Sequence, residues 1–97
     1  MSDLDEILAV LRCALPELQR RWPIRSLSLF GSVARDEARP ESDLDMLVEF
    51  DAPIGLTEFL ALEERLTAIT ERRVELVSRK ALKPYISYRV LQEALRV

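Results

Sequence analysis

Apolar residues recur at helical spacing in three stretches of the chain. The first two stretches predict amphipathic helices over 3–20 and 57–70, each with an apolar face that must be buried against another element. The third predicts a last helix over 84–96, because Pro84 suits the first turn of a helix. The residues expected on the buried faces of these helices are Leu4, Ile7, Leu8, Leu11, Leu15, Leu18, Phe59, Leu62, Leu66, Ile69, Ile86, Val90, Leu91, Ala94 and Leu95.

Three shorter runs, 24–30, 43–50 and 73–77, have the composition of β-strands. A short helix is expected over 33–37, between the first two strands. The order is therefore helix, strand, short helix, strand, helix, strand, helix. It predicts an α/β (α+β) fold, with a small mixed three-stranded sheet flanked by helices, as a single domain over residues 1–97.

The lengths of the connections predict the directions of the strands. About a dozen residues separate the first two strands, which is barely enough for a parallel crossover, so we expect an antiparallel pair. A full helix separates the second and third strands, which favours a parallel, right-handed connection. With these directions, the end of the first strand and the starts of the other two lie at one edge of the sheet.

Asp43 and Asp45 stand out because they lie within an otherwise apolar strand. Side chains two residues apart on a strand point to the same face, roughly 6–7 Å apart along the chain. Burying two anions side by side is costly, and a bound divalent cation removes that cost. Mg²⁺ fits best, because it is held by few carboxylates together with phosphates and water. The alternative is that both side chains are solvated, or cap a turn after Ser42.

Two further features fall at the same predicted edge of the sheet. Gly31 and Ser32 form a turn at the start of the short helix, where free N–H groups favour phosphate oxygens. By itself this turn would be an ordinary connection, and Glu75 by itself would be a solvated charge on a short strand. Their convergence with Asp43 and Asp45 favours a site that holds metal ions and the phosphates of a nucleotide.

The composition disfavours several classes of protein. A formal net charge of −3 and a pI near 5.0 argue against direct binding of nucleic acid by bulk electrostatics. A candidate local basic patch is formed by Arg72, Arg73, Arg79, Lys80 and Lys83. Histidine is absent, which removes Ser-His-Asp triads and most zinc sites, so the chemistry must use carboxylates, hydroxyls and cations.

The single cysteine, Cys13, excludes an intrachain disulfide and indicates a reducing compartment, so a cytoplasmic location is expected. Cys13 itself is interpreted as a small core residue. The N-terminus is acidic and lacks the profile of a signal peptide, and no apolar run approaches the length of a transmembrane helix. No membrane partner is therefore expected.

The segment GSVARDEARPESDLDMLV resembles the signature of the minimal nucleotidyltransferase (MNT) family, a branch of the DNA polymerase β-like nucleotidyltransferases. That signature is G-S-x-A-R, a gap, and then S-D-x-D followed by an apolar strand. The matching residues are Gly31, Ser32, Ala34, Arg35, Ser42, Asp43 and Asp45. The third carboxylate of the family is usually an aspartate on a later strand, and Glu75 occupies that place here.

The resemblance implies the nucleotidyltransferase fold and a transfer of AMP from ATP to an acceptor hydroxyl with the help of two Mg²⁺ ions. The implied catalytic and metal-binding residues are Asp43, Asp45 and Glu75. The implied nucleotide-binding residues are Gly31, Ser32, Arg35 and Ser42. For Arg35 the alternative is an ion pair with a surface carboxylate.

Many MNT proteins are antitoxins whose partner is a helical HEPN-domain ribonuclease toxin, so the resemblance also implies a hetero-oligomer. Such an antitoxin adds AMP to a tyrosine of the toxin, or neutralises the toxin by binding it. The sequence therefore predicts a Mg²⁺-dependent protein adenylyltransferase. The alternative is a binding module with weak or no catalysis, which the exchange of aspartate for Glu75 would fit.

Overall fold

The computed structural model describes residues 3–31, 34, 43–81 and 90–97, and most of its helices and strands lie close to the ranges that the sequence predicts. The elements are α1 (Asp3–Arg21), β1 (Ile24–Phe30), β2 (Leu44–Phe50), α2 (Leu56–Thr70), β3 (Val74–Ser78), the 3₁₀ turn η1 (Arg79–Ala81) and β4 (Leu95–Arg96). The short helix expected over 33–37 lies outside the described residues, apart from Ala34 in a turn.

The strands form one mixed sheet in the order β3-β2-β1-β4. β1 and β2 are antiparallel, and β2 and β3 are parallel, so both predicted strand directions are confirmed. The end of β1 therefore lies beside the start of β2, and the start of β2 beside the start of β3. This common edge is where the sequence places the candidate site.

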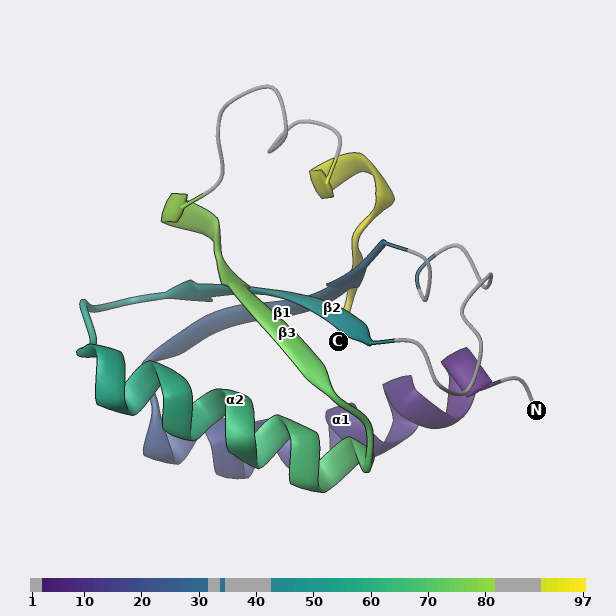
Figure 1. Ribbon diagram of the computed structural model, residues 1–97, viewed down its shortest axis with the longest axis horizontal. Coiled ribbons are helices and arrows are strands. Elements are labelled where there is room, and N and C mark those ends of the chain that lie inside the picture. The colour runs from purple at the N-terminus through teal and green to yellow at the C-terminus, as the bar shows by residue number, and fades with distance from the viewer. Residues whose placement is uncertain (1–2, 32–33, 35–42, 82–89) are drawn as a thin grey trace.

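Both long helices pack on one face of the sheet, as Figure 1 shows, while η1 and the helical turn Val90–Glu93 lie on the other side. Alternate residues of β2 (Leu44, Met46 and Val48) are fully buried beneath α1 and α2. The intervening residues therefore project from the opposite side, which we call the second face of the sheet. The core between the helices and the sheet consists of Ile7, Leu11, Leu18, Trp22, Ile24, Leu27, Leu29, Leu44, Met46, Val48, Leu62, Leu66, Val74 and Leu76.

The C-terminal segment differs from the prediction. Only Val90–Glu93 is helical among the described residues there, with the Ala94 N–H donating to the Val90 carbonyl at 2.8 Å. Leu95–Arg96 instead forms β4 and pairs antiparallel with β1, and the chain continues this contact through Val97. The helix expected to reach Arg96 was therefore wrong at this end, and the sheet has four strands rather than three. Pairing with the edge of β1 satisfies backbone groups that would otherwise be left open, and two residues are too short to show a strand period.

Two residues of α1, Cys13 and Pro16, are unusual for their positions in the helix. Cys13 is exposed, so its interpretation as a core residue was wrong: it lies away from the apolar stripe that contains Leu11 and Leu18. The helix continues through Pro16, which is exposed, so water can reach the carbonyl that lacks its N–H partner. In the described part of the chain, the helices are too short or too polar to cross a membrane.

Candidate active site

Asp45 and Glu75 are neighbours across the parallel strands β2 and β3. The register pairs Asp45 with Glu75, and on the other side Asp45 with Phe30 of β1. Register partners in a sheet point to the same face from strands ~4.8 Å apart, so both carboxylates project from the second face. Glu75 is exposed and Asp45 is half-buried. The convergence of these two acidic residues, predicted from the connections alone, is confirmed.

Gly31 brings the backbone against the carboxylate of Asp45. Its φ is +72°, a left-handed conformation that residues with a side chain rarely adopt. A Cβ atom at this position would collide with Asp45 Oδ2 and would lie 3.3 Å from its Cγ. The turn after β1 therefore lies close against the carboxylate, and a side chain at residue 31 would require both a strained backbone and a shift of Asp45.

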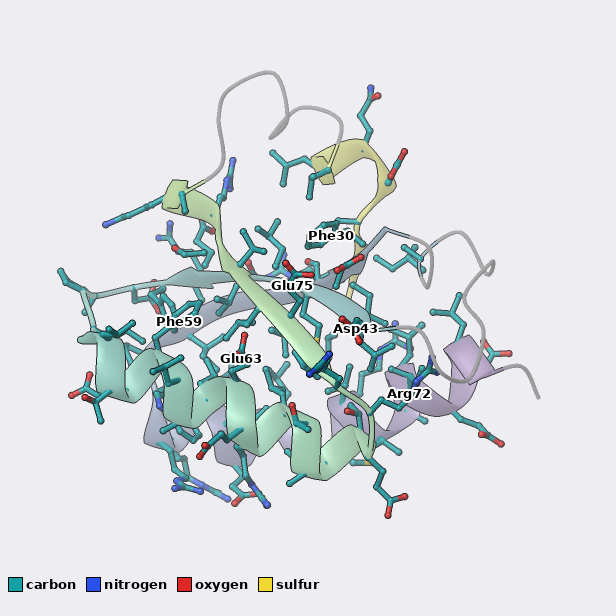
Figure 2. The ribbon with its side chains drawn as sticks, viewed as in Figure 1. Phe30, Asp43, Phe59, Glu63, Arg72 and Glu75 are labelled. Atoms are coloured by element: carbon teal, nitrogen blue, oxygen red, sulfur yellow. The ribbon has the colours of Figure 1, made fainter. Side chains whose placement is uncertain are left out.

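Asp43 lies immediately before β2 at the same edge of the sheet. The Leu44 N–H donates to the Arg73 carbonyl at 2.8 Å, which aligns the starts of β2 and β3. Figure 2 shows Asp43, Glu75 and Phe30 at this end of the sheet. Asp43 is exposed and stands one residue before β2, so the prediction that it lies within the strand was wrong by this residue.

The carboxylates supply the oxygen ligands that Mg²⁺ prefers. Among the described residues, however, no three acidic, cysteine or histidine side chains are grouped so that they could hold a metal ion by themselves. Mg²⁺ needs only one or two carboxylates when phosphate oxygens and water complete its shell. The adjacent pair Asp45 and Glu75 fits that requirement, whereas the assignment of Asp43, Asp45 and Glu75 as a three-carboxylate set for two ions stays a prediction.

Three of the predicted nucleotide-binding residues, Ser32, Arg35 and Ser42, lie outside the described residues. Their roles therefore stay predictions. The structure describes Ala34 of the same signature as part of a turn that follows Gly31.

The sequence reasoning missed one residue that contacts β3 next to the candidate site. Glu63 of α2 accepts a hydrogen bond from the Leu76 N–H at 2.9 Å, next to Glu75 on β3 (Figure 2). β3 is the outer strand of the sheet, so the Leu76 N–H has no strand partner on that side. A glutamate thirteen residues earlier, on an otherwise ordinary helix face, gives no sequence signal of this contact.

The predicted basic patch is divided by the structure. Arg72 and Arg73 precede β3, whereas Arg79 and Lys80 follow it in η1, so the length of the strand separates the two pairs. Lys83 lies outside the described residues. The run is therefore not one continuous surface in the described part of the chain.

Comparison with known proteins identifies the family. Residues 11–97 match the nucleotidyltransferase domain model. The chain is 40% identical over 97 residues to the protein adenylyltransferase MntA of Thermococcus cleftensis, covering 100% of this chain and 98% of that protein.

Two solved structures extend the comparison. A structure assigned to a minimal nucleotidyltransferase matches with a TM-score of 0.83 and 36% identity, covering 100% of this chain and 97% of that one. A complex of tri-AMPylated Shewanella oneidensis HEPN toxin with MNT antitoxin matches in fold with a TM-score of 0.60, at 18% identity over 97% of this chain and 67% of that one. The chain therefore belongs to the nucleotidyltransferase domain family and is a homologue of the protein adenylyltransferase MntA.

Proposed function

We propose that this chain transfers AMP from ATP to a hydroxyl group, that of a tyrosine, on a HEPN-domain partner protein, and that it neutralises this partner as an antitoxin. The observation that carries the proposal is the pairing of Asp45 with Glu75 on the second face, beside the tight turn at Gly31. The name of the MntA relative and the AMPylated toxin in the Shewanella complex support the protein acceptor. The lone Cys13 fits a reducing cytoplasm.

In the proposed reaction the acceptor oxygen attacks the α-phosphorus of ATP. The new oxygen–phosphorus bond forms as the bond to the β-phosphate breaks, and pyrophosphate leaves. Gly31 and Ser32 hold the β- and γ-phosphates, because N–H groups after a glycine turn can approach phosphate oxygens closely. Glu75 takes the proton of the acceptor hydroxyl, since it is the more exposed carboxylate of the pair.

Asp43, Asp45 and Glu75 would hold Mg²⁺. When bound, the ions would neutralise charge on the phosphates and orient the two reacting oxygens. The β2–β3 register places Asp45 beside Glu75. The turn at Gly31, which lies against the carboxylate of Asp45, would hold the phosphates beside that side chain.

A direct test uses a HEPN-domain protein from the same organism as the acceptor, together with Mg²⁺ and ATP labelled on its α-phosphate. We expect the label on the partner, whereas ATP labelled on its γ-phosphate should transfer none. The double variant Asp43→Asn/Asp45→Asn should lose transfer while it stays folded. The matched control is Glu6→Gln/Glu64→Gln, which also removes two carboxylates, both exposed and on the helices, and should transfer AMP normally.

Transfer by the Asp43→Asn/Asp45→Asn variant at the wild-type rate would overturn the assignment of the site. If the wild-type chain inhibits the partner without labelling it, the chain is the binding module that was the alternative from the sequence.

A further inference from the structure

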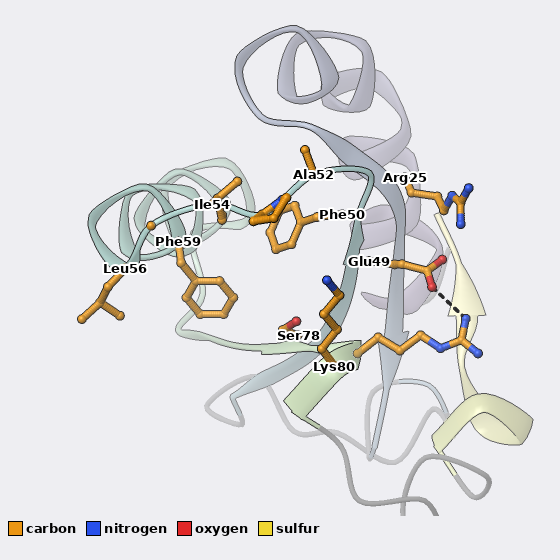
Figure 3. A pocket seen from close by; sticks show the side chains of 12 residues that line it. Arg25, Glu49, Phe50, Ala52, Ile54, Leu56, Phe59, Ser78 and Lys80 are labelled. Atoms are coloured by element: carbon orange, nitrogen blue, oxygen red, sulfur yellow. Dashed lines mark hydrogen bonds and ion pairs between the residues drawn. The ribbon is translucent and has the colours of Figure 1, made fainter.

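A hollow of about 670 Å³ lies at the end of the sheet opposite Asp45 and Glu75. Its walls come from the ends of β2 and β3, the segment after β2 and the first turn of α2 (Figure 3). Phe50 and Phe59 meet edge to face there, with ring centroids 6.4 Å apart, and give the hollow an apolar wall.

A second hollow of about 440 Å³ adjoins the first and shares Arg25, Glu49 and Arg79 with it. It lies over β1 on the second face of the sheet, where its lining includes Ser28 and Arg96. We call the two together the distal hollow. The part over β1 therefore lies on the face that carries the candidate active site, at the other end of the strands, whereas Phe50 and Phe59 line the hollow on the side of α2.

The distal hollow is positively charged although the chain as a whole has a net charge of −3. Its cations are Arg25, Arg79, Lys80 and Arg96. Arg79 pairs with Glu49 at 3.0 Å (the dashed line in Figure 3), and Arg25 pairs with the nearby Asp51 at 3.1 Å. Within the described residues, Lys80 and Arg96 have no ion-pair partner, so two positive charges are left in excess.

Exposed apolar side chains extend this surface beyond the hollow. Leu56 lines its rim and is 74% exposed, and Leu60, one turn later on the same side of α2, is 48% exposed. Leu91, which was wrongly expected on a buried helix face, is 41% exposed and lines the part over β1. Exposed apolar side chains on separate elements around one hollow are typical of a protein interface rather than of a pocket for a small molecule alone.

We propose that the distal hollow docks a segment of the acceptor protein in which acidic side chains stand beside apolar ones. The apolar side chains pack against Phe59 and Leu56, and the carboxylates pair with Lys80 and Arg96. This inference rests on the proposed function in one respect, that the acceptor is a protein. RNA fits less well, because a polyanion is repelled by the net negative chain and gains nothing from the exposed leucines.

Docking at the distal hollow would help to position the acceptor for the reaction at Asp45 and Glu75. A partner held at the distal hollow and at Asp45 is fixed at two points, one at each end of the strands, which orients its hydroxyl and saves entropy at the reacting site. Among the described residues, the two long helices cover the first face of the sheet, whereas the second face carries only η1 and the turn Val90–Glu93 and is therefore the more open side for an acceptor.

The test measures binding without transfer, by calorimetry of the same HEPN-domain protein with this chain in the absence of ATP. Lys80→Glu and Leu56→Ser should each raise the Kd about tenfold or more. Both side chains are exposed, so neither change should disturb the fold. The matched controls are Arg20→Glu and Val10→Ser on α1, also exposed, and both should bind like the wild type.

Hydrogen exchange of the complex gives a second measurement, in which residues 52–60 and 78–81 should become protected. If Lys80→Glu and Leu56→Ser both bind with unchanged affinity, or if protection is confined to other segments, the docking site is overturned. The proposed AMP transfer is not affected by that result. Weakened binding by the variants without any AMP transfer would support the docking site and overturn the proposed function. Failure of the wild type to bind this protein would overturn both, and tight binding of single-stranded RNA that Lys80→Glu abolishes would assign the hollow to RNA instead.

Discussion

The carboxylate of Asp45 occupies the space that a side chain on Gly31 would need. Gly31 directly follows β1, which ends at Phe30, and Asp45 lies in β2. The antiparallel register pairs Phe30 with Asp45 and so brings Gly31 and Asp45 together. Gly31 thus meets two independent demands: a φ of +72° and a close approach to a carboxylate. The same glycine begins the segment that resembles the MNT signature.

Replacing Gly31 by alanine should therefore affect both stability and activity. We expect Gly31→Ala to lose about 1–3 kcal/mol of unfolding free energy, from backbone strain and displacement of Asp45. AMP transfer should fall with it, because Asp45 is proposed to act in the reaction. Urea unfolding and initial rates of transfer measure the two effects.

Gly55 provides the matched control. It has an ordinary φ of −79° and no atom within 4 Å of the place where a Cβ would stand. Gly55→Ala should change stability by less than about 1 kcal/mol. If the two alanine variants prove equally stable and equally active, the close approach at Gly31 does not matter.

Glu75 is the residue at which the chain departs from the family pattern, so its role can be tested by charge and by length. Glu75→Gln keeps the size but removes the charge, and we expect the transfer rate to fall about 100-fold or more. Glu75→Asp restores the usual carboxylate and should keep much of the rate. Stability should rise slightly in Glu75→Gln, because Asp45 loses an anionic neighbour on the adjacent strand. A glutamine variant with full activity would show that Glu75 is a surface charge.

Removal of divalent cations tests the metal requirement separately. EDTA should abolish AMP transfer, and added Mg²⁺ should restore it. Mg²⁺ with a non-hydrolysable ATP analogue should also stabilise the fold, by about 2.7 kcal/mol at about 100 times the Kd. In the variant Asp43→Asn/Asp45→Asn, Mg²⁺ and the analogue should no longer raise the free energy of unfolding, whereas the stability without ligand should stay the same. Transfer that persists in EDTA would exclude a metal-dependent reaction.

The sequence was sufficient to place Asp45 beside Glu75, because this depends on strand directions, and the lengths of the connections set those directions. It was also sufficient for the buried faces of α1 and α2, where Leu11, Leu18 and Leu62 follow the helical period and are fully buried. Local pattern and chain length are the information that a single sequence carries well.

What it could not predict depends on contacts between distant residues. Leu95 fits a helical pattern as well as a strand, and only the open edge of β1 decides between them. The distal hollow gathers Arg25, Arg79 and Arg96 from three elements, whereas the sequence groups Arg79 with Arg73. The local sequence around these residues does not indicate either feature.

The hydrogen bond between Glu63 and the Leu76 N–H is another contact between distant residues, and we expect it to hold the outer strand β3 in place. Its carboxylate accepts the Leu76 N–H, so Glu63→Ala should leave that group without its partner and cost about 1–3 kcal/mol. Hydrogen exchange of the Leu76 amide should accelerate more than that of the other amides of β3. Glu63→Gln should restore most of the protection, since its amide oxygen can accept the same bond. Glu64→Ala, one residue away and exposed, is the control and should change neither measurement. An unchanged Leu76 amide in Glu63→Ala would mean that β3 is held by β2 alone.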